Sequence, residues 1–501
     1  MIALSGKLMK NLIITPLFCT AIAAVIGFYA LGSAHPAVII TVVSLSLFVL
    51  CFFRVLSISA EQLTENGGML RVTSFCCACF AVGLALGVCA ADAGRNAVKF
   101  GLSEDQITGI EGVLLEDPRV LSSGTAMASV SLRKCASKNA RVTSSGEITF
   151  FFLKESDDSL FAQRLREFGR GSVIFADGTL RRNDRGYTFS ASSLHIIKPA
   201  PAAEKMRTGI RLSLMKRFDG KTWGALSLAL LVGIRDNLDV NLTAVYRDAG
   251  LSYILALSGM HLAVITALIS FLLKKPLGLK AASITGAVII TVYCLLVGPM
   301  PSLVRSAIMY LLGVFTIIAA VPKKSMSILS LSFLIQIIIT PAAGSSLSFI
   351  LSYAALLGIL ITARQITALL NGLIPDFILN PLALSCGAFL STAGICGFCF
   401  GSIAPIGIIA GLAIVPITTV FMIGSMIWLL LDVFSVSFIL NLPLTWIYRS
   451  MEIISSVAGK VPGIGINPVL MLALSVLMLI GIAMLDYKRQ SGLLMLKPFS
   501  L

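Results

Sequence analysis

Apolar runs of about 20 residues recur along most of this chain, and they constrain its fold more than any other feature. A helix of about 20 predominantly apolar residues is long enough to cross a bilayer. The runs predict membrane-spanning helices at residues 11–31, 37–53, 72–91, 251–273, 281–298, 302–321, 326–340, 346–363, 382–400, 404–430 and 468–485. Residues 434–457 could either cross the bilayer or lie flat on it. The sequence therefore predicts a polytopic α-helical membrane protein with about 10–12 transmembrane helices.

The charge of the chain agrees with this class and leaves two interpretations of its basic excess. Only 13% of the 501 residues are charged, against roughly 25% in soluble domains. The formal net charge is +15. One interpretation is the enrichment of Lys and Arg in cytoplasmic loops that any polytopic membrane protein shows. The other is a polyanionic partner such as nucleic acid, and charge alone favours the first.

Residues 92–222 interrupt the apolar runs and have a different character. They hold 21 of the 39 Lys and Arg residues and 15 of the 24 Asp and Glu residues. Short β-like runs alternate with turn residues at 109–115, 126–132, 147–153, 171–177 and 186–192. Five such strands in about 100 residues predict a small barrel or sandwich. The basic residues flanking the first three spans are Lys7, Lys10, Arg54 and Arg71. Placing them in the cytoplasm puts the insert outside the membrane.

These features divide the chain into four predicted parts. Residues 1–91 form three transmembrane helices, and residues 92–200 form the soluble β domain. Basic and apolar residues alternate in the linker 201–222, which predicts an amphipathic helix on the membrane surface. Residues 223–501 form a helical core.

Polar residues interrupt the first span of this core. Within the predicted helix 251–273, Ser258 and His261 are three residues apart and share a face, with Gly259 beside them. Lipid cannot satisfy such groups, so they call for a partner helix or a water-filled path. We therefore expect Ser258, Gly259 and His261 to line a water-filled channel or to face a partner helix.

Two further spans carry polar side chains that fit the same path. Arg305 lies within an apolar segment, where a charged side chain costs at least about 2.5–3.5 kcal/mol. It could face a cavity and meet an anion, or it could reach the outer headgroups from its position near the end of the helix. Ser348 and Ser352 are four residues apart on one helix face. They could line a hydrated lumen or join two helices.

A serine hydrolase built on Ser258 and His261 is the enzymatic alternative. Catalysis needs the Ser hydroxyl within about 3 Å of an imidazole nitrogen, and usually a third group. Residues three apart on one helix seldom meet this requirement, and the only other histidines are His35 and His195. The chain also has no GxxxxGK[ST] loop for ATP. We expect no enzymatic activity, cofactor or metal.

Three stretches resemble one known family. They are DAGLSYILALSGMHLAVI at 248–265, GPMPSLVRSAIM at 298–309 and SLSFILSYAALLGI at 346–359. In this order they resemble the ComEC-type competence proteins, and the resemblance covers nearly the whole chain. Tyr253 departs from the pattern, because many members have His there.

The resemblance implies a multi-pass protein of the bacterial inner membrane that passes single-stranded DNA into the cytoplasm during natural transformation. It implies an extracytoplasmic OB-like barrel after the third helix. The implied partners are single-stranded DNA, a DNA receptor, cytoplasmic proteins that translocate or protect DNA, and the lipid bilayer; a homo-oligomer is left open. Longer members carry a C-terminal metallo-β-lactamase-like domain, which we expect this chain to lack.

The OB-like domain has one cluster suited to nucleic acid. OB folds often bind single strands through a basic groove and stacking aromatics. Residues of both kinds gather near one turn: Arg181, Arg182, Arg185 and Tyr187. They could contact DNA, or they could be the solvated tip of a hairpin.

A functional alternative from another class is a secondary transporter of a small molecule or ion with an external binding domain. Many such transporters contain inverted repeats, and no convincing internal repeat is evident in this sequence. The channel is therefore the favoured function.

Overall fold

The computed structural model describes residues 16–31, 82–91, 98–120, 125–137, 140–152, 169–183, 186–235, 238–298, 300–321, 325–465 and 467. The chain divides into two compact units. The barrel unit comprises Arg95–Leu228 with Ile234–Leu238, and the helical unit comprises Met1–Gly94, Ala229–Gly233 and Asp239–Leu501.

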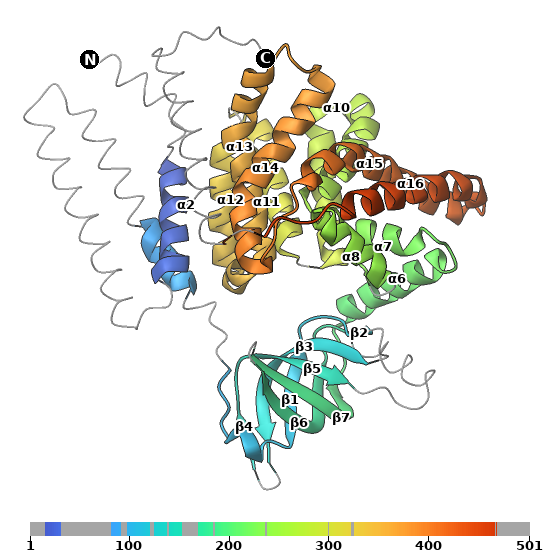
Figure 1. The fold of residues 1–501 in the computed structure, drawn as a ribbon. Coiled ribbons are helices and arrows are strands. Elements are labelled where there is room, and N and C mark those ends of the chain that lie inside the picture. Colours follow the sequence, from blue (N-terminus) through green and yellow to red (C-terminus); the bar gives the residue numbers. More distant parts are fainter. Residues whose placement is uncertain are drawn as a thin grey trace, which may run out of the picture. The chain divides into compact units, whose positions relative to one another are not determined.

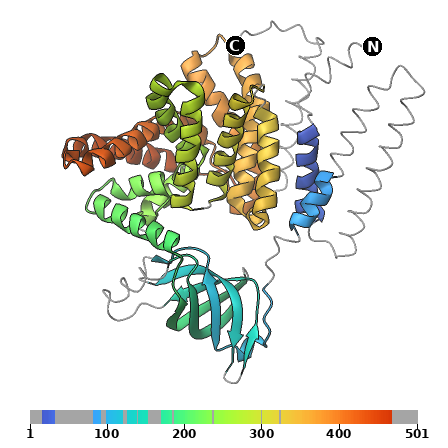
Figure 2. The ribbon, with the colours of Figure 1, turned by 180° about the vertical axis from the view of Figure 1, so that it is seen from behind.

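Five strands of the barrel unit close into a ring. They are β1 (Gly109–Leu114), β3 (Ala126–Ala136), β5 (Glu147–Phe152), β6 (Val173–Asn183) and β7 (Gly186–Lys198). The order around the ring is β1-β6-β7-β5-β3, and β3 pairs with β1 to close it (Figures 1 and 2). Among the five described strands of this ring, β5 and β7 pair in parallel and the other pairs are antiparallel. Two short strands, β2 (Arg119–Val120) and β4 (Arg141–Thr143), add to β3. The predicted OB-like barrel is confirmed.

Alternating side chains explain why these runs form a barrel. Successive residues of a strand point to opposite faces, and in β5 the inward positions are Ile148, Phe150 and Phe152. Phe150 packs against Phe189 of β7 with ring centroids 4.9 Å apart. Phe151 lies on the outer face and is half-buried. The aromatic run is thus mainly barrel core.

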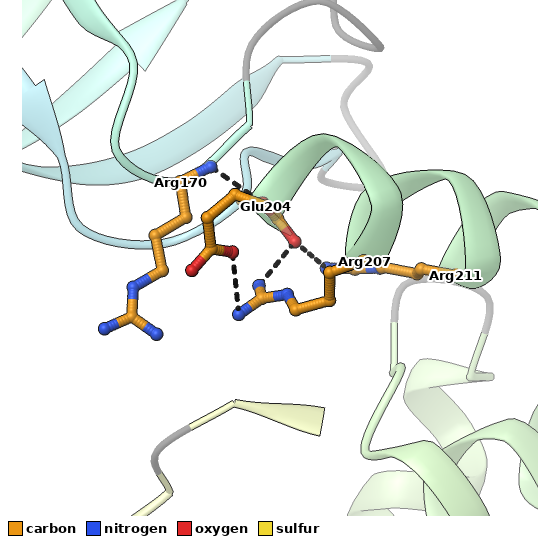
Figure 3. Close-up of polar contacts among 5 residues, drawn as sticks. Arg170, Glu204, Arg207 and Arg211 are labelled. Atoms are coloured by element: carbon orange, nitrogen blue, oxygen red, sulfur yellow. Dashed lines mark hydrogen bonds and ion pairs between the residues drawn. The ribbon is translucent and has the colours of Figure 1, made fainter. Parts of the chain in front are cut away.

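The predicted linker helix is present and is held to the barrel by ion pairs, and its position on the membrane surface stays a prediction. Helix α6 (Ala202–Phe218) directs Arg207 and Arg211 to Asp117, at 2.8 Å and 3.2 Å (Figure 3). Two of its basic side chains are therefore ion-paired within the unit. Trp223, which follows the helix, is buried and packs edge-on against Phe218.

The helical unit is built from apolar helices. Its elements are α2 (Pro16–Ile26), η1 (Gly27–Leu31), a helix at Val82–Ala91, α8 (Val240–Asp248), α9 (Ser252–Leu255), α10 (Gly259–Val297), α11 (Pro301–Ile318), α12 (Ser325–Ile339), η3 (Pro341–Ser345), α13 (Leu347–Leu370), α14 (Asp376–Phe400), α15 (Ile406–Val433), η4 (Ser437–Leu440) and α16 (Asn441–Gly459). Helix α7 (Gly224–Val232) lies between α6 and α8 in the chain, and η2 (Glu104–Gln106) belongs to the barrel unit. Within the described residues, α10, α11, α13, α14 and α15 are long and apolar enough to cross a membrane.

These helices confirm a polytopic α-helical fold and refine several predicted spans. Helix α12 is apolar but has only 15 residues. Helix α16 forms where residues 434–457 were ambiguous, and it is not among the five span-capable helices. The predicted spans 37–53 and 468–485 lie outside the described residues.

The predicted span 251–273 required correction at its start, whereas its separation from the span 281–298 is confirmed. The first helix begins at Gly259, because residues 251–258 form the short helix α9 and an extended break. Gly278, with φ 77° and ψ 168°, is not helical and divides α10 into two helices, one for each predicted span. Glycine takes this conformation without a steric penalty. Pro276, two residues earlier, further weakens the helical hydrogen bonding.

Candidate functional site

The polar motif at Ser258 lies at a break between two helices. After α9 the chain turns extended at Ala256, and Ser258 becomes the N-cap of α10. The hydroxyl of Ser302 on α11 donates to the Leu257 carbonyl at 2.6 Å and fixes the break to that helix. A polar start of α10 is therefore held inside the helical unit.

Ser258 and His261 form a capping box. The Ser258 hydroxyl accepts from the Met260 backbone N–H at 3.3 Å, and the Ser258 backbone N–H donates to His261 Nδ1 at 3.1 Å. His261 is fully buried. These bonds satisfy helix-end donors that would otherwise lack partners. Both side chains therefore cap the N-terminus of α10.

The Ser258 hydroxyl and the His261 ring lie closer together than the sequence analysis expected. Residues three apart on one helix seldom bring such groups within about 3 Å, but Ser258 Oγ lies 3.1 Å from His261 Nδ1. That prediction assumed one continuous helix, and the N-cap position of Ser258 brings the side chains together. Because His261 Nδ1 accepts a backbone N–H, the contact belongs to the capping box.

Arg305 is buried next to this motif. It lies near the start of α11 and is only 7% exposed. Its Nη2 donates to Ser306 Oγ at 3.4 Å, and its Nη1 lies 3.9 Å from Met309 Sδ. The guanidinium also lies over the Tyr353 ring, 5.7 Å from the centroid. Arg305 is therefore enclosed by protein groups rather than extended from the unit's surface.

Gly259 brings the start of α10 against Arg305. A Cβ atom at this position would lie 2.9 Å from Ser306 Oγ and 3.3 Å from Arg305 Nη2. Such a distance is too short for a side chain to fit without movement of its neighbours. Gly259 and Arg305, which the sequence placed on separate helices, thus meet at one point.

Tyr353, which lies over Arg305, belongs to a polar network that the sequence analysis did not predict. The Tyr353 hydroxyl donates to Gln336 Oε1 at 3.0 Å and lies 3.3 Å from Ser332 Oγ. Gln336 Nε2 donates to the Pro301 carbonyl of α11 at 2.9 Å. The sequence did contain a signal for this network. Gln336 is a lone amide in the apolar run 326–340, and a buried amide needs hydrogen-bond partners.

Ser348 and Ser352 take no part in the described contacts of Arg305. Both lie on α13, where Ser348 is exposed and Ser352 is half-buried. The side chain of α13 that reaches Arg305 is the neighbouring Tyr353. A lumen-lining role for the two serines stays a prediction.

In the barrel unit, Arg181 and Arg182 are exposed at the end of β6. Tyr187 pairs with Arg182 across the β6–β7 hairpin, and the guanidinium lies 5.8 Å from its ring centroid. Phe100 packs edge-on against the same ring. The Tyr187 hydroxyl donates to Glu104, which raises the pKa of the phenol. Tyr187 therefore contacts Arg182, Phe100 and Glu104 within the barrel unit. Arg185 lies outside the described residues.

Comparisons with known proteins found one family and two relatives. A model of the Competence protein family matches residues 230–489. An uncharacterized protein of Aquifex aeolicus (strain VF5) is 24% identical over 313 residues, which are 62% of this chain and 73% of the relative. ComE operon protein 3 of Bacillus subtilis (strain 168) is 29% identical over 136 residues, which are 26% of this chain and only 17% of that relative. No solved structure matches the chain.

Proposed function

The chain belongs to the Competence protein family, and from this membership, which gives it a role in DNA uptake, we propose that it is a channel for single-stranded DNA. The strand would pass through the helical unit into the cytoplasm during natural transformation. The five span-capable helices supply the membrane part of such a channel.

The observation that carries the proposal is the environment of Arg305. Among the described residues, no carboxylate forms an ion pair with this buried guanidinium. Ionised side chains within membrane segments normally pair with one another or mark the path of a substrate or ion. DNA presents a phosphate at every nucleotide, and Arg is a strong phosphate ligand. A strand passing here would supply the missing negative charge.

The barrel would guide the strand toward the helical unit. Arg181 and Arg182 are exposed and can contact phosphates, as basic grooves of OB folds do. We place the barrel on the extracytoplasmic side of the inner membrane, because Lys7, Lys10 and Arg54 then lie in the cytoplasm. In this function the chain has no catalytic step, so a receptor and cytoplasmic DNA-handling proteins would deliver and pull the strand.

The uptake of labelled DNA tests the proposal. Cells lacking this gene should bind labelled DNA outside but accumulate none that is protected from added DNase. The wild-type gene should restore the protected signal. Unchanged protection in the deletion strain, when those cells are demonstrably competent, would refute the channel.

A further inference from the structure

The donors of Arg305 are poorly used in this structure. A guanidinium has five N–H donors and no acceptor. Its contact to Ser306 is long at 3.4 Å, and its other contact is to a thioether, which accepts weakly. Its Nε has no partner among the residues that the structure describes. A buried cation with this few acceptors is arranged to receive another group.

The start of α10 adds positive potential at the same point. The N-terminus of a helix carries a partial positive charge and favours anions. Gly259, the first residue of α10, lies against Arg305 Nη2. Two positive groups therefore lie close together, an arrangement that an anion beside the guanidinium would stabilise.

An aromatic ring covers the guanidinium in place of that anion. Tyr353 offers its face to Arg305 at 5.7 Å, a cation–π contact. Its hydroxyl is fixed by Gln336, which in turn binds the Pro301 carbonyl at the start of α11. The ring thus compensates part of the charge but gives the N–H groups no hydrogen-bond acceptor.

We infer that Arg305 and the start of α10 form a binding site for one phosphodiester group, and that Tyr353 covers this site in the structure. The phosphodiester supplies both the charge and the acceptor oxygens that the guanidinium lacks. Its arrival displaces the ring from Arg305. This inference rests on the proposed function for the identity of the anion, and it assigns Tyr353, Gln336 and Gly259 to the site.

Equilibrium binding of a labelled oligothymidylate to the full-length protein in nanodiscs tests this site. Each phosphate contact contributes about 0.7 to the slope of log K against log salt for a single strand. Arg305→Gln should lower the slope by about that amount, while Arg305→Lys should keep it. Arg364→Gln, at an exposed arginine of α13, is the matched control and should leave the slope unchanged. The barrel is unchanged in all these variants, so any binding of the oligothymidylate to the barrel cancels in the comparison.

Removal of the cover should tighten binding. Tyr353→Leu should raise the affinity roughly thirtyfold, the size of a desolvated cation–π contact. Tyr353→Phe keeps the ring but frees it from Gln336, so it should give a smaller gain and serves if the leucine variant fails to fold. Adding Arg305→Gln to either should cancel the gain.

Two results would overturn the site. One is a salt slope that Arg305→Gln leaves unchanged; the other is an affinity that neither Tyr353 variant raises. If either occurs while the deletion strain still loses DNA uptake, the phosphodiester site fails and the channel stands. If the deletion strain takes up DNA normally, the channel itself fails.

Discussion

Asp117 in the barrel unit and Arg305 in the helical unit are both buried charged groups, but their surroundings differ. The Asp117 carboxylate is 6% exposed and receives Arg207 at 2.8 Å, Arg211 at 3.2 Å and the Arg170 backbone N–H at 3.0 Å. Arg305 is buried to a similar degree. Its partners in the described part of the chain are a hydroxyl, a thioether and an aromatic ring.

This difference separates a charge that stabilises the fold from one that is available to a ligand. The bonds to Asp117 join residues 90 and 94 positions apart and attach α6 to the barrel. Opposite charges and hydrogen bonds together compensate the cost of removing such groups from water. Arg305 has no such compensation from a carboxylate among the described residues. Burial alone therefore does not distinguish the two charges, and the proposed function rests on the incomplete pairing of Arg305.

The largest expected effect is the loss of the Asp117 carboxylate. Asp117→Asn leaves Arg207 and Arg211 facing a neutral group, and breaking a buried pair typically costs about 3–5 kcal/mol. Hydrogen exchange of the barrel strands in the full-length protein should show this destabilisation. Asp105→Asn, at an exposed position, is the control and should have little effect. Equal exchange in both variants would contradict the structural role of Asp117.

Acid should weaken the same contact by a smaller amount. Burial alone raises the pKa of Asp117, but the Arg170 N–H, Arg207 and Arg211 outweigh it and hold the pKa below its ordinary value of 3.8. The stabilisation is therefore present above about pH 4 and is lost as the pH falls through the lower folded-state pKa. Barrel protection measured against pH should decline in that window, and the decline should be absent in Asp117→Asn.

Replacement of Arg305 should change stability little and function greatly. Arg305→Met substitutes an apolar side chain for a buried, incompletely paired charge, which is neutral or stabilising by about 1 kcal/mol. DNase-protected DNA uptake should nevertheless be lost. The two measurements are thermal unfolding of the purified protein and uptake by the complemented strain. If Arg305→Met destabilises the protein as strongly as Asp117→Asn does, the proposed difference between a structural Asp117 and a ligand-binding Arg305 fails.

The smallest effect is expected at Ser258. Ser258→Ala removes the N-cap of α10 and should cost about 1 kcal/mol, while DNA uptake by the inserted protein stays close to the wild-type rate. Ser258→Asn preserves capping and should restore the stability. If uptake is lost in both variants at normal protein levels, Ser258 contributes to the path itself, as the sequence suggested.

Sequence patterns identified the local structure well, because local periodicity encodes it. The alternation in 147–153 predicted β5, and the two apolar runs around Gly278 predicted the two halves of α10. The break before Gly259 was missed, since Ala256 and Leu257 are as apolar as the helix that follows. Its signal was the N-cap pattern of Ser258 with His261 three residues later.

The contacts that define the candidate site depend on distant residues and were harder to predict. Arg305 was identified as a charge in an apolar run. That Tyr353 covers it, and that Gln336 fixes the ring, follows from the packing of α11, α12 and α13. The Asp117 contacts span about 90 residues, so no local periodicity reports them.

Photocrosslinking in competent cells tests most directly whether DNA passes Arg305. A benzophenone side chain is placed either at Met309, which contacts Arg305, or at Phe315, which is exposed on the same helix. Both proteins must first support uptake of labelled DNA. We predict that illumination during uptake links the labelled strand to the protein at Met309 and not at Phe315. Active transport with no link at Met309 would contradict a path beside Arg305.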